Sequence, residues 1–398
     1  MISVEEARAR IVAPLRPTPP EVVSLPQAWG RVLAAPVLAR LTQPPGDVSA
    51  MDGYALRAGD AGPWRVIGSA PAGHPFAGTV GRDEAVRLFT GSLIPAGADG
   101  VVLQEDADRD GERLTLREAP RPGGHIRRAG GDFRAGDVLA AGGTRLGARG
   151  VGLVAAANHP WVAVHRRPRI GILATGDEIA LPGDPIGAGG IVSSNAHALA
   201  ALVQSAGGEP VVLPIAADSA EAIAAVADRL GGIDLLVTTG GASVGEHDLV
   251  QAGLGARGFE LDFWKIAMRP GKPLLYGRLA GTPVLGLPGN PVSAFVCSVL
   301  FLLPALARLG GRAGESLPLA NARLAAAVRG NDHRADHLRA KLAVALDGAL
   351  LATPFERQDS SMLRLLADAD CLVLRAPGAP AAGAGAPVQV IRLDQSLL

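Results

Sequence analysis

A repeated order of apolar strand, loop and helix between residues 168 and 309 constrains the fold of this chain more than any other feature. Strands are expected at residues 170–174, 211–215, 235–239 and 284–287, and helices at 196–205, 220–230 and in the apolar segment that ends at Leu309. Such alternation is typical of a doubly wound parallel sheet. In sheets of this type ligands bind where the carboxyl ends of the strands meet, so the loops after the strands are the first places to look for chemistry.

The segments on either side of this block have different patterns. Ser3 and Glu6 form a capping box in front of a short amphipathic helix. Short β runs separated by glycine and proline predict a small β-rich domain, and alternation beyond Gly310 predicts a C-terminal β-barrel. The expected organisation is multidomain α/β plus β: a discontinuous N-terminal domain (1–46 and 133–167) with a small β-rich insert (47–132), a central doubly wound parallel α/β domain (168–315) and the barrel (316–398).

Length and charge agree with a multidomain protein that recognises its ligand locally. A chain of 398 residues exceeds what one hydrophobic core usually supports. Lysine plus arginine and aspartate plus glutamate both total 38, and this balance argues against a broad basic face for nucleic acid or an anionic membrane. Cys297 and Cys371 lack the spacing of a zinc site or a disulfide framework, so both are expected to be buried thiols.

Neither a secretory signal nor a membrane span is expected. The first ten residues carry charges where a signal needs an apolar stretch. The longest apolar run, residues 292–307, is interrupted by Pro304 and is shorter than the roughly 20 residues that a span requires. The protein is therefore expected to be cytoplasmic.

Two strand-end loops combine glycine with oxygen-bearing side chains. The first contains Thr175, Gly176, Asp177 and Glu178, and the second runs from residue 238 to Asp248. Glycine lets a backbone approach a ligand, and consecutive amides can bind an anion while carboxylates hold Mg²⁺ against phosphate. In the second loop the candidate phosphate-binding residues are Gly240, Gly241, Ser243 and Gly245. A capping turn is the alternative interpretation of the first loop, and a plain loop that of the second.

Asp218 follows the second strand and stands three residues before Glu221. It could simply cap the next helix. Its place at a strand end also brings it toward Asp248, and two carboxylates that share one cation are a common protein contribution to a magnesium and phosphate site. Both interpretations stay open on the residues alone.

A basic cluster follows, in which Lys265, Arg269 and Lys272 stand within eight residues of an otherwise apolar segment. Positive charges held close together favour an oxyanion, although solvated surface charge is the alternative. The turn from strand to helix then offers free amides and the positive end of a helix dipole to an anion, or serves as a purely structural turn. Its candidate residues are Pro288, Asn290, Pro291 and Ser293.

Taken together, these segments resemble the molybdopterin molybdenumtransferase family, the MoeA-type proteins related to the E domain of gephyrin, over nearly the whole chain. The matching motifs appear in the family's order and spacing: Ser-Ala-Met-Asp-Gly-Tyr-Ala at 49–55, Thr-Gly at 90–91, Thr-Gly-Asp-Glu at 175–178, Gly-Gly-Ala-Ser-Val-Gly-Glu-His-Asp at 240–248, Arg-Pro-Gly-Lys-Pro at 269–273 and Leu-Pro-Gly-Asn-Pro at 287–291.

The resemblance implies a fold, an assembly and a reaction. The α/β domain would be of the molybdopterin-binding type, and the chain would form a homodimer through its N-terminal domain. Adenylylated molybdopterin would bind in a cleft between subunits, AMP would leave in a Mg²⁺-dependent step, and molybdate would be ligated by the dithiolene sulfurs. The resemblance leaves open whether a separate molybdopterin adenylyltransferase docks on the chain, and whether tungstate replaces molybdate.

The same resemblance implies residue roles. Asp218 and Asp248, with Glu178, would hold the metal, and the partner subunit would supply Asp52, Thr90 and Asp132. Lys265, Arg269, Lys272 and Ser293 would bind phosphate or the oxyanion. At position 269 the family usually carries lysine, and arginine changes a point donor into a planar fork.

Three other functions are weighed against this one. A molybdopterin adenylyltransferase shares the sheet, but it typically reads Gly-Gly-Thr-Gly where this chain has Gly-Gly-Ala-Ser at 240–243. Nicotinamide-nucleotide deamidases of the competence-damage type lack the motif at 49–55. A gephyrin-like scaffold without activity would have no use for a metal and phosphate site.

Overall fold

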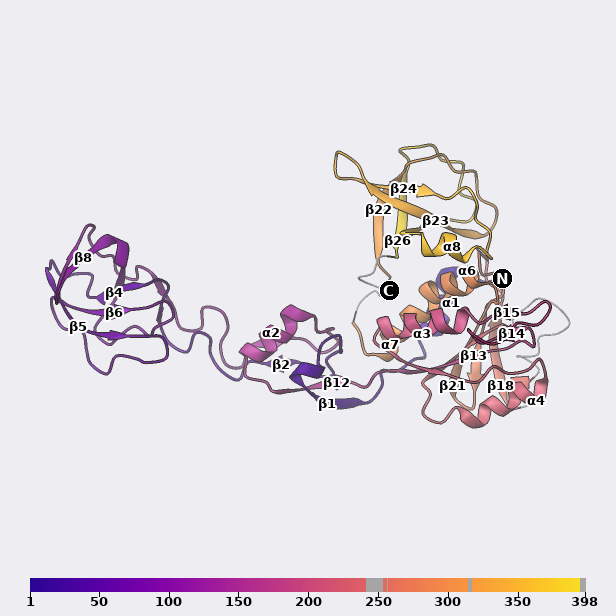
Figure 1. Ribbon diagram of the computed structural model, residues 1–398, viewed down its shortest axis with the longest axis horizontal. Helices are drawn as coiled ribbons and strands as arrows, with labels where there is room; N and C mark the ends of the chain where they lie inside the picture. Colours follow the sequence, from indigo (N-terminus) through magenta and orange to yellow (C-terminus); the bar gives the residue numbers. More distant parts are fainter. Residues whose placement is uncertain (241–252, 256, 314–316, 394–398) are drawn as a thin grey trace.

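The computed structural model describes residues 1–240, 253–255, 257–313 and 317–393. Figure 1 shows an elongated molecule with a small β domain at one end, a slender middle region, and an α/β domain with a β-barrel beside it at the other end. The chain passes from the α/β domain out to the far end and back, so the outward and returning segments run side by side in the middle region.

The central sheet has six strands in the order β16-β13-β17-β21-β20-β18. Their bounds are β13 Arg169–Ala174, β16 Glu209–Val212, β17 Leu235–Thr239, β18 Phe259–Trp264, β20 Leu275–Leu279 and β21 Thr282–Leu287. The first four in the order are parallel, which confirms the predicted doubly wound sheet, and β20 and β18 extend it as antiparallel strands that the sequence pattern did not indicate. β17 is buried along its whole length because helices cover both faces of the sheet.

The helices of this domain begin or end at the expected loops. They are α3 Asn195–Ser205, α4 Ala220–Ala224, η3 Ala225–Arg229, α6 Pro291–Cys297, η4 Ser298–Leu302 and α7 Leu303–Leu309, and a small parallel pair, β14 Ile179–Ala180 with β15 Ile191–Val192, flanks the first loop. Helix α1 (Val4–Val12) has its predicted Ser3 cap, and its Ala7 and Ile11 lie in the same core as α7. Residues 1–12 thus pack with the α/β domain, although the expected division placed them with the middle region.

The last apolar segment forms one continuous helix of 19 residues, Pro291–Leu309. This confirms the helix predicted to end at Leu309: Pro304 interrupts the apolar run but not the helix, because it follows the π-helical turn η4 and falls in the first turn of α7, where a missing amide is tolerated. The helix is long and apolar enough to cross a membrane by composition alone, but 78% of it is buried inside this fold.

The middle region is assembled from two distant segments. β1 (Pro20–Ser24) pairs with β12 (Trp161–His165), and β2 (Val37–Leu38) pairs with β11 (Val138–Ala140). Helix α2 (Ala148–Ala156) and the 3₁₀ turn η1 (Leu25–Gln27) complete it. Val23 and Leu33 share one hydrophobic core with Val154 and Val162, which is the physical basis of the discontinuous arrangement.

The two β domains differ in closure. The far domain is an open six-stranded sheet with the order β7-β4-β6-β5-β9-β8. Its elements are β3 Val48–Ser49, β4 Gly53–Leu56, β5 Trp64–Ala70, β6 Glu84–Leu88, β7 Gly100–Leu103, η2 Gln104–Asp106, β8 Ala107–Asp110, β9 Arg113–Leu116 and β10 Ile126–Arg127. The C-terminal domain is a barrel of five strands that closes through the β23–β25 pairing, as predicted.

The barrel is joined to the α/β domain by backbone pairing. Its elements are β22 Leu319–Leu324, β23 Ala335–Val344, β24 Leu350–Pro354, α8 Leu363–Ala367, β25 Cys371–Arg375 and β26 Pro387–Arg392. The short strand β19 (Met268–Arg269), which comes from the basic segment of the α/β domain, pairs with the start of β23. Cys297 and Cys371 are both buried free thiols, as expected.

Candidate functional site

A pocket of about 730 Å³ lies at the carboxyl ends of the parallel strands. It is lined by residues that follow β13, β16, β17 and β21, together with the starts of α3 and α6. Nine residues singled out from the sequence line it: Thr175, Gly176, Glu178, Asp218, Gly240, Pro288, Asn290, Pro291 and Ser293. The predicted strand-end residues thus gather at the carboxyl edge of the sheet, where parallel sheets of this type bind ligands.

Backbone hydrogen bonds lock the strand-end loops to one another. The Thr175 amide donates to the Thr239 carbonyl at 3.2 Å, and the Gly176 amide donates to the Ala216 carbonyl at 3.2 Å. Asp177 does not line the pocket, and its carboxylate accepts from the Asp218 amide at 3.0 Å. Asp177 thus positions the loop that carries Asp218.

Two glycines in these loops have no room for a side chain. Gly240 has φ +97°, and a Cβ there would lie 2.5 Å from the Thr175 carbonyl oxygen. Gly176 has φ +144°, and its Cβ would lie 2.6 Å from a carboxylate oxygen of Glu178. At Gly240 both the positive φ and the contact with backbone require glycine, whereas at Gly176 the positive φ requires it and the Glu178 side chain could move aside.

The N-termini of two neighbouring helices reach the pocket. Helix α3 begins at Asn195 and the long helix begins at Pro291, and both residues line the pocket. The positive end of each helix dipole favours an anion at such a place, although Pro291 has no amide and the Val292 amide already donates to the Ser360 carbonyl. The pocket therefore has an anion-attracting wall.

Sequence analysis missed Asn195, although the residue joins two strand ends. Its side-chain amide donates to the Thr239 hydroxyl at 2.8 Å and to the Gly289 carbonyl at 2.7 Å. The polar run of Ser193, Ser194 and Asn195 directly before a helix was the available signal, since such residues are typical of helix starts. Ser361, from the barrel, also lines the pocket and had no signal of its own in the sequence.

The acidic groups Glu178 and Asp218 also line the pocket. In the part of the chain that the structure describes, neither carboxylate has a hydrogen-bonding or cationic partner for its oxygens. The Thr175 hydroxyl is buried and also lacks a partner within the described residues. Oxygen groups that face one pocket without protein partners suit a hard cation such as Mg²⁺.

The described residues hold no group of three or more His, Cys, Asp or Glu placed to bind a metal. Two of the three predicted metal ligands, Glu178 and Asp218, line the pocket. The third, Asp248, lies outside the described residues, as do Gly241, Ser243 and Gly245.

The basic cluster divides among different surroundings. Lys265 is half-buried, has φ +75°, and holds its ammonium 3.9 Å from the centre of the Trp264 ring. Lys272 is exposed, and its neighbour Pro273 lines the pocket. The two lysines thus lie near the rim without being lining residues of the pocket in the described chain.

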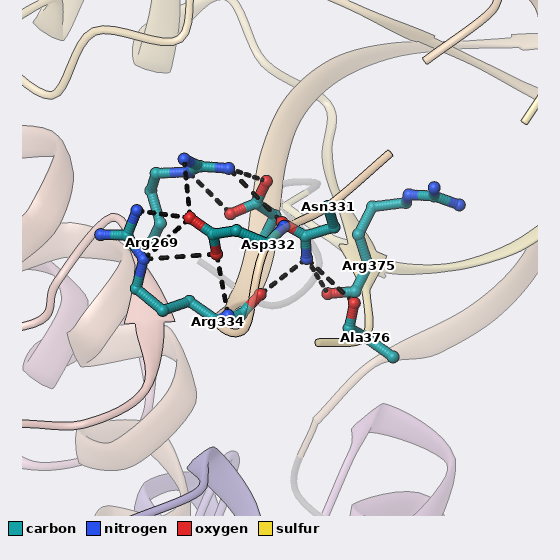
Figure 2. Close-up of polar contacts among 7 residues, drawn as sticks. Arg269, Asn331, Asp332, Arg334, Arg375 and Ala376 are labelled. Atoms are coloured by element: carbon teal, nitrogen blue, oxygen red, sulfur yellow. Dashed lines mark hydrogen bonds and ion pairs between the residues drawn. The ribbon is translucent and has the colours of Figure 1, made fainter. Parts of the chain in front are cut away.

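Arg269 is held by acidic residues of the barrel, as Figure 2 shows. Its guanidinium binds Asp336 with Nε–Oδ1 2.8 Å and Nη2–Oδ2 2.6 Å, and lies 3.6 Å from Asp332. Asp332 in turn pairs with Arg334 at 2.7 Å, and this contact holds the pKa of Asp332 well below its usual range. This fork-to-carboxylate geometry suits arginine better than lysine. The structure therefore joins Arg269 to the barrel through Asp336, and the oxyanion role expected from the sequence stays a prediction.

The remaining predicted residues lie in or beside the far β domain. The Asp52 carboxylate accepts from the Thr90 amide at 2.7 Å and from the Thr90 hydroxyl at 2.9 Å, and these bonds lower the pKa of Asp52. Asp132 is exposed, and its amide donates to the Gln43 carbonyl. Within one chain these groups do not meet the strand-end pocket, because the middle region separates the two ends of the molecule (Figure 1).

Comparison with known proteins identifies the family. The chain matches the MoeA N-terminal region (domain I and II) at residues 2–158, the "Probable molybdopterin binding domain" at 171–308, and the MoeA C-terminal region (domain IV) at 321–393. It is 37% identical to a molybdopterin molybdenumtransferase of Nostoc sp. over 74% of this chain and 70% of that one.

Two further relatives cover almost the whole chain. A molybdopterin molybdenumtransferase of Bacillus subtilis is 32% identical, with 99% of this chain and 94% of that one covered. The crystal structure of a molybdopterin biosynthesis MoeA protein from Pyrococcus horikosii is 30% identical, with a TM-score of 0.84 over 99% of each chain. Together with the strand-end pocket, these matches show that the chain belongs to the molybdopterin molybdenumtransferase (MoeA) family, the transferases of molybdenum cofactor biosynthesis.

Proposed function

We propose that the chain inserts molybdenum into adenylylated molybdopterin, with Mg²⁺-dependent release of AMP. One observation carries the proposal: two carboxylates that have no partner among the described residues line the same 730 Å³ pocket as the N-termini of two helices. A diphosphate linkage needs both a cation to offset its charge and donors for its oxygens. The pocket offers groups suited to each task.

In this proposal Glu178 and Asp218 hold the cation, and Asp248 completes its ligand set. When bound, Mg²⁺ supplies Lewis-acid stabilisation of the charge that develops on the phosphate oxygens. The amides at the start of α3 bind the phosphate oxygens, the positive dipole end of the long helix favours their charge, and Ser293 donates a hydroxyl close to them. Gly176 and Gly240 let the backbone approach the ligand closely, and Lys265 and Lys272 attract the molybdate dianion from the rim.

A second copy of the chain would complete the site. The middle region exposes large apolar side chains, among them Val22 at 69% and Trp161 at 58%. The β1–β12 register pairs Val22 with Ala163 and Ser24 with Trp161, so these side chains share one face, while Val23 and Val162 fill the core on the other. An exposed apolar face of this kind is typical of an interface between subunits. A homodimer through it could bring the partner's Asp52, Thr90 and Asp132 to the pocket.

The test incubates the purified protein with adenylylated molybdopterin, molybdate and Mg²⁺, and measures AMP together with the reconstitution of a molybdoenzyme that lacks its cofactor. AMP that appears only with Mg²⁺, together with active molybdoenzyme, supports the proposal. Binding of the adenylylated substrate without any AMP release would favour a scaffold. Formation of the adenylylated compound from molybdopterin and ATP would instead show an adenylyltransferase.

The cytoplasm is part of the proposal, because the substrates and the acceptor apoenzymes would be met there. Docking with a separate molybdopterin adenylyltransferase would let the adenylylated intermediate pass directly to this chain. Size-exclusion chromatography of the two enzymes together, with and without the intermediate, tests such docking.

A further inference from the structure

A second cavity lies where the middle region joins the α/β domain. Its volume is about 60 Å³, well above the roughly 10–15 Å³ that one water molecule needs. The walls come from the loop after η1, the turn before α2, the linker between β12 and β13, the end of α3, and α7. Five arginines line this junction cavity: Arg31, Arg145, Arg166, Arg167 and Arg312.

Two of the five arginines have carboxylate partners. Arg31, which is only 8% exposed, pairs with Glu21 and also donates to the His165 carbonyl at 2.8 Å. Arg166 donates to the Asp234 carboxylate at 2.8 Å. These two pairs account for the acidic groups that contact the cluster within the described chain.

Neither Arg145 nor Arg167 forms an ion pair with a carboxylate of the described residues, although Glu21 and Glu209 lie close enough to Arg167 to raise its pKa in part. Arg145 donates to the carbonyls of Gly30 and Ser205, at 3.3 and 3.4 Å, and Arg167 donates to the Gly207 carbonyl at 3.3 Å. Burial, together with the charges of Arg312 and Arg167, lowers the pKa of Arg145. Burial and the charge of Arg31 lower the pKa of Arg167. The cavity is thus a place of concentrated positive charge.

Arg312 adds a further positive charge to the wall, and its guanidinium has no hydrogen bond or ion pair among the residues that the structure describes. Glu315, the nearest acidic residue in the sequence, lies outside the described residues. Pairing of these two would still leave Arg145 and Arg167 without an ion pair. The excess charge of the cavity therefore rests on those two arginines.

We propose that the junction cavity binds a small tetrahedral oxyanion of the phosphate or sulfate class. Each guanidinium has five N–H donors, and Arg145 and Arg167 use only some of theirs on backbone carbonyls. Like charges held close together repel one another unless an anion compensates them, and five arginines line this one cavity. A bound anion would contact both Arg145 of the middle region and Arg167 of the linker that leads to the α/β domain. This site is independent of the proposed function.

Titration calorimetry of the full chain with inorganic phosphate tests the proposal. The wild type should bind phosphate saturably, and R145Q/R167Q should bind one phosphate fewer per chain, because hydrogen bonds to charged groups contribute about tenfold or more to affinity. Any phosphate bound in the strand-end pocket stays in both proteins. Sulfate and molybdate should compete for the site, and chloride at equal ionic strength should not.

Two further variants keep the test decisive. A307F keeps every arginine but fills the cavity, so it should also lose the site, and R117Q, which breaks an exposed pair in the far domain, should bind as the wild type does. Single variant R145Q, at an exposed position, replaces the double variant if that protein does not fold. Equal phosphate stoichiometry in wild type, A307F and R145Q, or competition by chloride, overturns the proposal.

Discussion

Replacing Arg269 by alanine should loosen the barrel rather than remove a catalytic group. Asp336 has a side chain only 9% exposed, and it receives two hydrogen bonds from Arg269, whose own side chain is 48% exposed. Breaking a fully buried ion pair costs about 3–5 kcal/mol, whereas an exposed pair is worth about 0–1 kcal/mol. Because one partner is buried and the other is half-exposed, we expect the substitution to lower the free energy of unfolding of the barrel by about 2 kcal/mol.

Native-state hydrogen exchange measures this loss where it occurs. Since about 1.4 kcal/mol is a tenfold change in an equilibrium, the amides of β23 and β25 should exchange roughly 30-fold faster in Arg269→Ala. The exchange rates in Arg269→Lys should lie between those of the wild type and Arg269→Ala, because a lysine keeps the charge but cannot make the two parallel hydrogen bonds. Arg323→Ala is the matched control: its partner Asp347 lies 2.9 Å away in the same barrel, and both side chains are more than half exposed.

The docking role is refuted by one combination of results. If Arg269→Ala exchanges like the wild type in β23 but no longer releases AMP, the guanidinium serves the reaction and the contact with Asp336 is incidental. If Arg323→Ala accelerates exchange as much as Arg269→Ala does, burial of the carboxylate is not what gives the pair its strength.

The other predictions concern single contacts. Gly240→Ala should lower the melting temperature and the activity together, because a Cβ would lie 2.5 Å from the Thr175 carbonyl oxygen; calorimetry and an AMP assay show whether the two change in parallel. Asn195→Ala should reduce turnover about tenfold or more with little change in far-UV circular dichroism, because two hydrogen bonds between strand ends are lost. Burial lowers the pKa of His337 to about 4, below its unfolded value of about 6.5. The neutral imidazole therefore favours the folded state fully above pH 6.5, and the free energy of unfolding falls by up to about 3 kcal/mol as the pH drops to 4. Denaturant titrations at several pH values should show a flatter acid limb for His337→Asn than for the wild type.

The predicted parts of the fold were those governed by local patterns. Alternating strands and helices indicated the parallel sheet, and its topology then decided which loops meet, so Glu178, Asp218 and Asn290 could be grouped without knowing any contact. The antiparallel strands β18 and β20 gave no comparable signal, because no helix separates them in the sequence. The places of these two strands depend on pairing that the residue pattern does not specify.

The contacts that the sequence did not indicate depend on tertiary packing. Arg269 stands in a basic, proline-rich segment, and only the packing of a separate barrel brings Asp336 to it. Lys265 was predicted as an anion ligand from its charge and the family resemblance; its ammonium lies over the Trp264 ring, and its role as a ligand stays a prediction. The family resemblance supplied what the chain's own patterns could not, namely a reason to connect Asp52 with a pocket at the other end of the molecule.

The central claim is that the acidic wall of the strand-end pocket holds a cation against a diphosphate linkage. The most direct measurement is single-turnover AMP release from adenylylated molybdopterin by wild type and by Asp218→Ala, over a range of Mg²⁺ concentrations. The account predicts that Asp218→Ala still binds the substrate but needs far more Mg²⁺ and releases AMP at least 100-fold more slowly, on the order of the 3 kcal/mol that a metal ligand contributes. Wild-type rates in Asp218→Ala with an unchanged Mg²⁺ requirement would contradict it.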